Sequence, residues 1–343
     1  MTDSLSSELD SSSKRKWRAD AVRLTIGILE SEKDYRNLCV LGRGTYGDVF
    51  RMYDPHRDCD IAVKVVTSDN LADIETAVWP KLRHPNIVPL LEVHTFSPVD
   101  TVIFVMPVQY KTLHDVLQDK YFRKREGCLM YIKAWLYEVL CGLEYLNSRN
   151  LCHLDIKVDN VLITHKYTAM LCDFSFVNYT SRPLEKYDLG LPYIYRPPEA
   201  CHSLGETIKI DGISYDMWGY GVMVVEIFTQ FVLANTVSNE KCWYKEVYPT
   251  LFQALQEKQF KKEIAETFPA DVMNTGEIRL ALNFIHLFLK QNYEKRAIPS
   301  KAKKHQFLGE GTDLGPVPDP MWIYKGTEIV LSVFSDLATE LPI

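Results

Sequence analysis

The chain has 343 residues, 46% of them hydrophobic, and a formal net charge of −6. This length can hold one large two-lobed domain or two ordinary ones, with enough apolar content for a sizeable core. No apolar run approaches the roughly 18 residues that a membrane helix needs, and the negative charge offers no electrostatic footprint for nucleic acid. These features predict a soluble, globular, intracellular protein of the cytoplasm or nucleus, with no membrane and no nucleic-acid partner.

Residues 1–34 are expected to form a flexible extension, with helical character only over residues 21–30. The first 13 residues are polar and Ser-rich without an apolar core, so they do not resemble a secretory signal. A basic cluster, Lys14-Arg15-Lys16 with Arg18, has three open interpretations. It is a solvated tail, which is the commonest case, or a nuclear import signal, or a contact for phosphate.

Residues 35–108 have the pattern of a small β-rich lobe. Apolar runs separated by turn residues predict five strands and one helix. The strands are expected at residues 38–41, 49–53, 61–66, 87–93 and 102–108, and the helix at residues 72–82.

From residue 109 onward the pattern becomes helical. Apolar residues recur at helical spacing over residues 130–148, which predicts a long amphipathic helix packed into a core. Residues 215–228 are almost wholly apolar and predict a second, buried helix, after a long loop at residues 174–199. Weaker patterns predict helices at residues 240–259, 276–290 and 327–338.

The eight cysteines are scattered along the chain without any C-x-x-C pair, and most lie in apolar runs. In a reducing compartment this pattern predicts buried free thiols rather than disulfides or a zinc site.

The run at residues 153–160, followed by Asp173-Phe174-Ser175, carries the strongest chemical signal. Transfer of a γ-phosphoryl group needs a carboxylate near the attacking hydroxyl, a cation on the phosphate and oxygen ligands for a divalent metal. Four residues supply these groups in that order: Asp155, Lys157, Asn160 and Asp173. Residues 161–163 and 169–172 flank a short polar turn, and this strand-turn-strand pattern would bring the two metal ligands side by side.

Residues 42–49 form a G-x-G-x-x-G-x-V run. Such a run is weak evidence alone, because dinucleotide-binding turns use the same letters. Here it lies between two predicted strands rather than at the start of a helix. That context favours a flap whose backbone amides cover the oxygens of a triphosphate.

Lys64 lies in the apolar strand predicted at residues 61–66. A lysine in such a place is costly unless its charge is matched, and Glu75 on the following helix is the candidate partner. Together the two side chains would position the α- and β-phosphates. The alternative, a lysine at the solvated edge of a strand, loses weight because the glycine run and the catalytic run occur in the same chain.

His153 and Asp216 invite structural interpretations rather than catalytic ones. His153 comes two residues before Asp155, so we expect its imidazole to hold the loop. Asp216 enters the buried apolar helix and would be an unpaired charge unless it accepts hydrogen bonds from loop backbone. It is therefore expected to tie down the catalytic loop.

Taken together, these segments resemble the eukaryotic-type protein kinase family over residues 35–307. The following positions occur in family order: Lys64, Glu75 before His84-Pro85-Asn86, Asp155 with Lys157 and Asn160, Asp173-Phe174, Tyr195-Arg196-Pro197-Pro198-Glu199, Asp216 with Trp218, and Arg296. The resemblance implies an α+β bilobal kinase fold, with a β-rich N-lobe at about 35–108, an α-helical C-lobe at about 109–308 and a tail at 309–343. The active site would lie in the cleft between the lobes.

The resemblance also implies a role for each matching residue. Asp155 would orient the substrate hydroxyl and accept its proton, and Lys157 would neutralise the γ-phosphate. Asn160 and Asp173 would hold magnesium. The nucleotide would contact Leu41, Gly42, Gly44, Gly47, Val49, Ala62, Lys64, Glu75, Met106 and Val108, with Met106 behind the adenine and residues 107–109 as the hinge.

Outside the nucleotide site, Glu199 and Arg296 would form a buried ion pair that braces the substrate platform. Lys157, two residues after the catalytic aspartate, is the pattern of Ser/Thr kinases. The string at residues 195–199 resembles the branch that contains cyclin-dependent and mitogen-activated kinases.

Three positions depart from the family pattern. Leu154 stands where an arginine usually pairs with a phosphate on the activation loop, which predicts activity without phosphorylation of that loop. Ser175 replaces a glycine, which restricts positive φ and limits flipping of the segment, without directly affecting metal ligation by Asp173. Pro192 replaces a threonine that links the catalytic loop to the substrate platform, which leaves the preference beside the phosphoacceptor open.

Two spacings also depart from the pattern. The short separation of Lys64 and Glu75 predicts a shortened connection or helix. The long separation of Glu199 and Arg296 predicts insertions near residues 201–214 and 230–275. Such trimmed and drifted patterns resemble the kinases of large DNA viruses, including herpesviruses.

The sequence therefore predicts a protein kinase that uses ATP and Mg²⁺ to phosphorylate Ser/Thr hydroxyls of protein substrates, with its regulatory partner left open. One rival is a catalytically inactive scaffold, suggested by the changes at residues 154, 175 and 192. Retention of the four polar positions argues against it, since none of the three changed residues ligates metal or phosphate. The other rival is a small-molecule phosphotransferase, against which Lys157 and the platform at residues 195–199 favour a protein substrate.

Overall fold

The computed structural model describes residues 2–125, 127–184, 188–192, 195–201, 210–229, 251–252, 255–269 and 273–309, with side chains from residue 13 onward except at 120 and 201. These residues form two compact units. The first, called here the sheet unit, contains residues up to 68 and residues 94–108. The second, called here the helical unit, contains residues 69–93 and the described residues from 109 onward.

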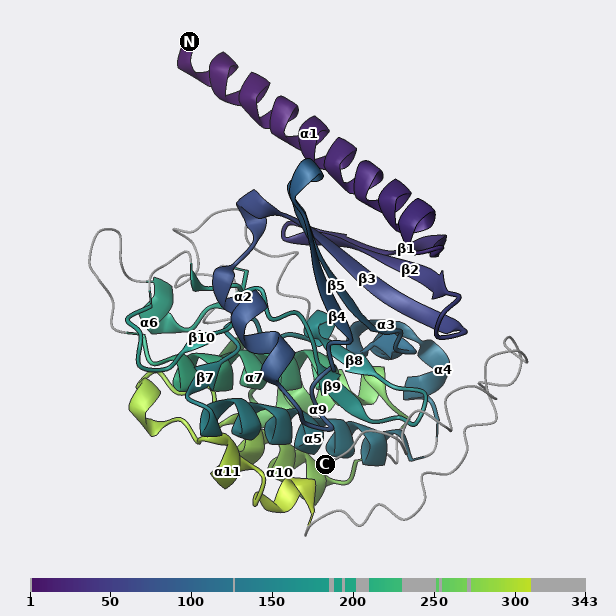
Figure 1. The fold of residues 1–343 in the computed structure, drawn as a ribbon. Helices are drawn as coiled ribbons and strands as arrows, with labels where there is room; N and C mark the ends of the chain where they lie inside the picture. Colours follow the sequence, from purple (N-terminus) through teal and green to yellow (C-terminus); the bar gives the residue numbers. More distant parts are fainter. Residues whose placement is uncertain are drawn as a thin grey trace. The chain divides into compact units, whose positions relative to one another are not determined.

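Five strands form one antiparallel sheet in the order β1-β2-β3-β5-β4 (Figure 1). The strands are β1 (Arg36–Gly44), β2 (Gly47–Asp54), β3 (Cys59–Thr67), β4 (Glu92–Phe96) and β5 (Thr101–Pro107). β3 is buried along almost its whole length, whereas β1 is an edge strand that is exposed at every position. The α+β fold class expected from the sequence is therefore confirmed.

The strand predicted at residues 87–93 is wrong in its position, because β4 begins only at Glu92. Pro89 interrupts the apolar run and has no backbone N–H to give to a ladder. Before it, Ile87 makes an isolated parallel bridge to Leu171, and the Val88 N–H donates to the Leu171 carbonyl at 2.9 Å. This segment thus belongs to the helical unit.

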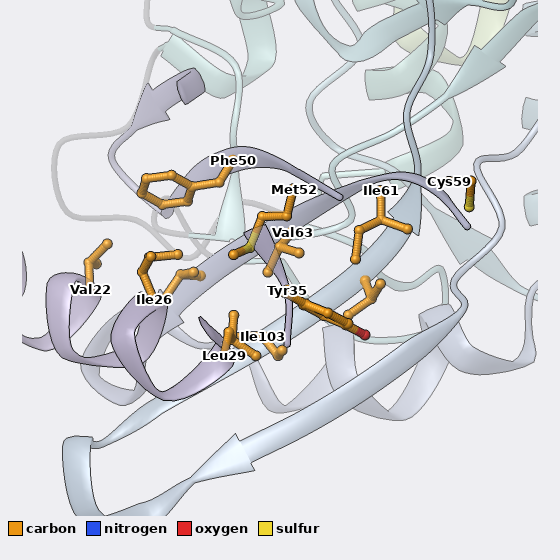
Figure 2. Packing of buried hydrophobic residues seen from close by; sticks show 12 residues of the cluster. Val22, Ile26, Leu29, Tyr35, Phe50, Met52, Cys59, Ile61, Val63 and Ile103 are labelled. Carbon is orange, nitrogen blue, oxygen red and sulfur yellow. The ribbon is translucent and has the colours of Figure 1, made fainter. Parts of the chain in front are cut away.

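The N-terminal extension differs from the flexible segment that we expected, since α1 (Thr2–Glu32) is a helix of 31 residues. Its second half buries one stripe of side chains, Ala21, Val22, Thr25, Ile26 and Leu29. This spacing of three and four residues places them on one face of the helix. Figure 2 shows Val22, Ile26 and Leu29 facing Phe50, Met52 and Ile103 of the sheet.

The helical unit is built around two long helices. α5 (Cys128–Ser148) and α7 (Gly212–Thr229) confirm the helices predicted at residues 130–148 and 215–228. Both bury most of their residues, and the Tyr220 hydroxyl of α7 donates to the Leu136 carbonyl of α5 at 2.9 Å. Their apolar faces therefore form the core on which the loops of this unit are mounted.

Shorter elements complete the helical unit. Its remaining helices are α2 (Asp73–Val78), α3 (Leu113–Gln118), α4 (Lys120–Arg123), α6 (Pro198–Cys201), α9 (Glu257–Thr267), α10 (Thr275–Ile285) and α11 (Pro299–Ala302). Its short strands are β6 (Lys111–Thr112), β7 (Leu151–Cys152), β8 (Val161–Ile163), β9 (Ala169–Leu171) and β10 (Asn178–Tyr179). Across both units, turns of 3-10 helix lie at Ser68–Asn70, Trp79–Lys81, Ser97–Val99, Val158–Asn160, Tyr293–Lys295 and Gln306–Leu308.

Several predicted segments end differently or lie outside the described residues. The helix expected at residues 72–82 is α2 followed by a 3-10 turn that contains Pro80, and the helix expected at residues 276–290 ends at Ile285. The helix expected at residues 327–338, and most of the one at residues 240–259, lie outside the described residues, as do most of the two expected insertions.

Six cysteines have described side chains, and all are free thiols. Cys59, Cys128 and Cys152 are buried as predicted, whereas Cys39 is exposed on the edge strand β1. Within the described part of the chain, no helix has both the length and the apolar character that crossing a membrane would require.

Candidate active site

The catalytic run lies in a loop of the helical unit between β7 and β8. β8 and β9 pair antiparallel with Val161 opposite Leu171, which confirms the predicted strand-turn-strand pattern. The Cys172 N–H donates to the Asn160 carbonyl at 3.0 Å, so the residues just before β8 and just after β9 are held together. This hairpin brings the backbone of the two predicted metal ligands into the same place.

Asp155 is at the centre of the loop and is only 2% exposed. Its Oδ2 accepts hydrogen bonds from Lys157 Nζ at 2.7 Å and from Asn160 Nδ2 at 2.6 Å. Its Oδ1 is buried and has no hydrogen-bond partner in the described part of the chain. Burial raises the pKa of Asp155, and the Lys157 ammonium opposes that rise. One carboxylate oxygen is thus fixed by the loop while the other keeps its capacity to accept a proton or a hydrogen bond.

The Asn160 amide is oriented by two bonds through its nitrogen. Nδ2 donates to Asp155 Oδ2 and also to the Asp155 carbonyl at 2.9 Å. Because the nitrogen side of the amide is engaged, the amide oxygen is directed away from Asp155. An amide oxygen and a nearby carboxylate suit Mg²⁺, which takes one or two protein oxygens and completes its shell with water and phosphate.

His153 and Asp216 hold the loop by hydrogen bonds to its backbone, as the sequence predicted. The two carboxylate oxygens of Asp216 accept the N–H groups of His153 and Leu154, each at 2.7 Å. His153 Nδ1 accepts the Asp155 N–H at 3.3 Å, so Nε2 carries the proton that it gives to the Cys172 carbonyl at 3.0 Å. Burial lowers the pKa of His153 to about 4, which keeps the imidazole neutral, and burial raises the pKa of Asp216 to about 7.

Asp173 adopts a left-handed backbone conformation with φ 61°, and the residue that follows, Phe174, is fully buried. The Phe174 ring lies 5.3 Å from the Trp79 ring and 5.4 Å from the His153 ring, centroid to centroid. The Ser175 hydroxyl donates to Asp173 Oδ1 at 2.6 Å. We expected the change from glycine to Ser175 not to affect metal ligation by Asp173 directly, and this stays a prediction, although the serine hydroxyl is bonded to one oxygen of that carboxylate.

Leu154 shows what replaces the arginine of the family pattern. Its side chain is fully buried, with φ 63°, in an apolar cluster. The cluster consists of Cys152, Leu154, Leu184, Leu189, Leu191, Ala200, Ile210 and Tyr215, with Phe176 and Tyr195 packed against it. The Gly190 N–H also donates to the Leu154 carbonyl at 3.1 Å. The described parts of residues 176–200 are thus held to the catalytic loop by apolar packing and backbone bonds.

The ion pair predicted between Glu199 and Arg296 is present. Arg296 Nη1 and Nη2 contact Glu199 Oε1 and Oε2 at 2.6 and 2.8 Å, a bidentate geometry. The Arg296 side chain is fully buried. This pair joins α6 to the end of the helical unit.

A pocket of about 300 Å³ opens beside Lys157 within the helical unit. Pro192, Tyr195 and Glu226 are among its lining residues. The Tyr195 hydroxyl donates to Glu226 Oε1 at 2.6 Å, and burial raises the pKa of Glu226 to about 7. The proline that replaces the threonine of the family pattern therefore forms part of a hollow next to the catalytic loop.

The sheet unit gathers most of the predicted nucleotide residues on adjacent strands. Gly42 of β1 pairs with Val49 of β2, which pairs with Lys64 of β3. Two positions further along β3, Ala62 lies opposite Met106 of β5. Leu41 precedes this row on β1 and is 49% exposed, and Val108 follows the end of β5.

The glycine-rich turn connects β1 to β2 and pairs Gly44 with Gly47. A Cβ at Gly42 would meet nothing within 4 Å, and one at Gly44 would meet only the Gly47 carbonyl at 3.5 Å. Neither position has a positive φ. Protein packing therefore does not demand glycine at these two positions, which leaves space for a ligand to approach the backbone closely.

Lys64 and Glu75 are both buried, at 6% and 1% exposure. Lys64 Nζ lies 5.8 Å from the centroid of the Phe104 ring on β5. Glu75 lies on α2, which has six residues, in agreement with the shortened helix predicted from the spacing. The two side chains belong to different units, so their pairing stays a prediction.

Sequence reasoning missed two contacts of these segments. The bond between Ser175 and Asp173 could not be foreseen, because the pattern marked Ser175 only as a lost glycine. The other is made by Arg18 of α1, whose guanidinium donates to the carbonyls of Gly44 and Thr45 in the glycine-rich turn. Its signal in the sequence was its position, three and four residues before the apolar residues Ala21 and Val22.

Comparison with known proteins agrees with these features. Residues 35–308 match the protein kinase domain family. Cyclin-dependent kinase 10 of Homo sapiens is 31% identical over 210 residues, which cover 59% of this chain and 56% of that protein. Cyclin-dependent kinase-like 2 of Homo sapiens is 29% identical over 202 residues, or 57% of this chain and 39% of that protein.

A plant relative gives the same picture. Cyclin-dependent kinase C-2 C of Arabidopsis thaliana is 30% identical over 203 residues, which cover 56% of this chain and 30% of that protein. The chain thus spans about half the length, or less, of the relatives that it matches. None of these three relatives is viral, so the resemblance to viral kinases stays a prediction. Since the family match covers most of the chain, the chain belongs to the protein kinase family.

Proposed function

We propose that this protein is an ATP- and Mg²⁺-dependent kinase that phosphorylates Ser/Thr hydroxyls of protein substrates. The observation that carries the proposal is the state of Asp155. One oxygen of its buried carboxylate is fixed by Lys157 and Asn160, while Oδ1 has no hydrogen-bond partner in the described residues. An oxygen in that state can accept a hydrogen bond from a substrate hydroxyl and take its proton as the phosphoryl group transfers.

Asn160 and Asp173 are the proposed ligands of magnesium. When bound, the metal would neutralise charge on the transferred phosphoryl group and orient it. The chain's own contribution is to fix the Asn160 amide through Asp155, and to hold the Asp173 carboxylate through the Ser175 hydroxyl. Lys157 Nζ is bonded to Asp155 Oδ2 at 2.7 Å. We propose that it leaves this oxygen and contacts an oxygen of the γ-phosphate when ATP is bound.

The proposed nucleotide contacts come from the sheet unit and from Glu75. The row formed by Gly42, Val49 and Lys64 places glycine backbone, an apolar side chain and a cation next to one another. These are the group types that a triphosphate and an adenine-bearing nucleoside require. We propose that Lys64, paired with Glu75, contacts the α- and β-phosphates, and that Met106 and Val108 contact the base.

Three observations support a protein substrate with Ser/Thr acceptors. Lys157 follows the Ser/Thr pattern, and the names of the relatives place them among cyclin-dependent and cyclin-dependent-like kinases. In addition, the pocket beside Lys157 is open and is lined by Pro192 and Tyr195 of the platform. A hollow on that side of the catalytic loop suits an extended peptide better than a small enclosed acceptor.

The first experiment is transfer of radiolabelled phosphate from ATP to a library of Ser-, Thr- and Tyr-centred peptides, in the presence of Mg²⁺. We expect labelling of Ser and Thr peptides by the wild type. Loss of about 10³-fold in rate is expected for Asp155→Asn, the order of magnitude of a lost positioned base. The matched control is Asp69→Asn, since Asp69 is an exposed carboxylate in the same unit.

The outcomes separate the rivals. Equal background labelling by wild type and Asp155→Asn would support the inactive scaffold. Labelling of small-molecule alcohols but not of any peptide would support the small-molecule phosphotransferase. The chain is assayed first alone and then with a cyclin, because the names of the relatives suggest a cyclin-type regulatory partner, and equal rates would show that none is needed.

A further inference from the structure

The glycine-rich turn is held by a residue that lies far before it in the sequence. Arg18 Nη2 donates to the Gly44 carbonyl and Nη1 donates to the Thr45 carbonyl, both at 2.6 Å. Nη2 also lies 3.5 Å from Asp48 Oδ1. The side chain is only 24% exposed. A planar guanidinium with parallel donors therefore grips two successive carbonyls of one turn.

The helix that carries Arg18 is firmly attached to the sheet. Val22, Ile26 and Leu29 pack in the same buried cluster as Phe50 and Met52 of β2 (Figure 2). The Thr25 hydroxyl, fully buried, is 2.7 Å from the Thr101 hydroxyl of β5. Arg18 precedes Val22 by four residues, so it lies on the same face of α1 as this stripe. The guanidinium is thus presented from a fixed support rather than from a mobile tail.

The two hydrogen bonds from Arg18 also determine the direction of the N–H groups in the turn. In a trans peptide, the carbonyl of one residue and the N–H of the next point in opposite directions. Fixing the Gly44 and Thr45 carbonyls toward α1 therefore turns the N–H groups of Thr45 and Tyr46 away from α1. Because the Arg18 guanidinium is a cation bonded to both carbonyls, it also polarises the two peptide groups, which strengthens their N–H groups as donors.

We propose that Arg18 is a positioning residue of the nucleotide site, which holds the amides of Thr45 and Tyr46 in the orientation that receives phosphate oxygens. This rests on the proposed function. A turn with glycine at 42, 44 and 47 has much conformational freedom to lose when it closes on a ligand. Because Arg18 restricts that freedom beforehand, it lowers the entropic cost of nucleotide binding.

The contact is not part of the family resemblance. The match to the protein kinase domain begins at residue 35, after the end of α1. The edge strand β1, which leads into the turn, is exposed at every position. The turn thus depends for its order on an element that this chain adds to the kinase domain.

Three single variants test the proposal in the full-length chain. Arg18→Met keeps the aliphatic stem but removes the donors, and Arg18→Lys keeps the charge without the fork of two donors. The matched control is Arg23→Met, because Arg23 lies on the same helix, its side chain is 78% exposed, and its polar contact within the described part of the chain is with Asp20. Circular dichroism and thermal unfolding check that all three variants are folded.

The first measurement needs no nucleotide. Arg43 lies at the start of the turn, so trypsin can cut the bond between Arg43 and Gly44 when the turn opens. Mass spectrometry gives the initial rate of that cut. We expect the rate to rise roughly three- to tenfold in Arg18→Met, the size expected for loss of one or two net hydrogen bonds. Arg23→Met should match the wild type, and Arg18→Lys should lie between them.

The second measurement is the dissociation constant of ADP with Mg²⁺, by calorimetry, together with KM for ATP and kcat. Arg18→Met should raise both the dissociation constant and KM by a similar three- to tenfold factor, with kcat changed less than about twofold. A merely structural role would lower the amount of active protein, and hence kcat, without this selective effect on KM.

The results have distinct meanings. An unchanged cut after Arg43 in Arg18→Met overturns the proposal whatever the kinetics show. A faster cut with unchanged nucleotide affinity overturns it as well, because the turn would then be ordered without benefit to the ligand. If the wild type neither binds ADP nor transfers phosphate, the proposed function fails, and the rate of the cut alone decides whether Arg18 orders the turn.

Discussion

The catalytic loop and the glycine-rich turn are held in place in opposite ways. In the helical unit, Asp155 and Asn160 are buried and bonded to each other. Asp216, which lies on α7, accepts hydrogen bonds from two backbone N–H groups of the same loop. In the sheet unit, the turn lies at the end of an exposed edge strand, and its carbonyls are bonded to Arg18 of α1.

This difference indicates which property a substitution should affect in each part of the site: stability, chemistry or nucleotide affinity. The catalytic loop is fixed by residues that belong to the family pattern and to the core, so a substitution there affects stability and chemistry together. The turn is fixed by one helix outside the family match, so a substitution there should affect nucleotide affinity with little cost in stability. Five predictions probe the comparison.

Removal of the Asp216 carboxylate should have the largest effect. In Asp216→Ala the N–H groups of His153 and Leu154 lose their acceptors inside the core, which costs about 2–4 kcal/mol of unfolding free energy. The kinase rate should fall by roughly 100-fold, since a misplaced catalytic group costs that much. Urea denaturation and the peptide assay measure both. Asp216→Asn, which keeps one acceptor, should be milder, and a stable, active Asp216→Ala would contradict the idea of a core-anchored loop.

Leu154→Arg should destabilise the chain by about 2–4 kcal/mol, because it places a charge in an apolar cluster. The arginine that the family pattern carries at this position thus cannot simply be restored. Thermal and urea unfolding measure the effect, with Leu154→Met as the size-matched control. A Leu154→Arg variant as stable as the wild type would show that the cluster tolerates charge and that our description of it is wrong.

The buried carboxyl of Glu138 on α5 should make stability depend on pH. It accepts the Ala169 N–H at 2.6 Å, and burial raises its pKa to about 7. The unfolded chain releases this proton near pH 4.5 and the folded chain near pH 7, so the contribution to stability is full below about pH 4.5 and is lost as pH rises to about 7.

Glu138→Gln removes that dependence, because the amide still accepts the bond and does not titrate. Between pH 5 and pH 8, the wild type should lose about 1–2 kcal/mol relative to Glu138→Gln, a value reduced for the partial exposure of the side chain. Urea denaturation at the two pH values measures the difference. If the two proteins differed by the same free energy of unfolding at pH 5 and at pH 8, the raised pKa of Glu138 would be refuted.

Ser175→Ala should have a moderate effect on activity and almost none on stability. It removes the hydroxyl that donates to Asp173 Oδ1, so the carboxylate is less restrained. We expect the concentration of Mg²⁺ that gives half-maximal rate to rise roughly three- to tenfold, the size of one lost hydrogen bond. Ser181→Ala serves as a control of the same chemistry at an exposed position. Equal metal requirements in the two variants would exclude a role for Ser175.

The smallest effect is expected from the hydroxyls of the activation loop. Replacing Tyr179 and Tyr187 by Phe, Thr180 by Val and Ser181 by Ala should leave the rate within about twofold, since Leu154 offers no charge to a phosphate there. Tyr187 lies outside the described residues. The peptide assay on protein treated with phosphatase and on the fourfold variant tests this, and a loss of tenfold or more in either would show that loop phosphorylation matters.

The sequence by itself determined the elements with a clear hydrophobic pattern and the residues of the motifs that carry the proposed chemistry. Local spacing was enough for α5, α7 and the β8–β9 hairpin, because hydrophobic periodicity reports burial directly. It also predicted the bonds of Asp216, because a charge that enters an apolar run has few ways to be compensated. The pairing of Glu199 with Arg296 was instead implied by the resemblance to the kinase family. The family match over residues 35–308 agrees with that interpretation.

Only the tertiary structure decided where polar atoms meet across long separations in the chain. α1 was expected to be flexible because its first half is polar, yet four side chains of its second half, Val22, Thr25, Ile26 and Leu29, pack against or bond to the sheet. The bond from Ser175 to Asp173, the apolar cluster around Leu154 and the grip of Arg18 on the turn leave no periodic trace in the sequence. Each depends on the direction of a single side chain and on backbone conformation, such as the positive φ of Leu154 and Asp173, which packing of the whole chain selects.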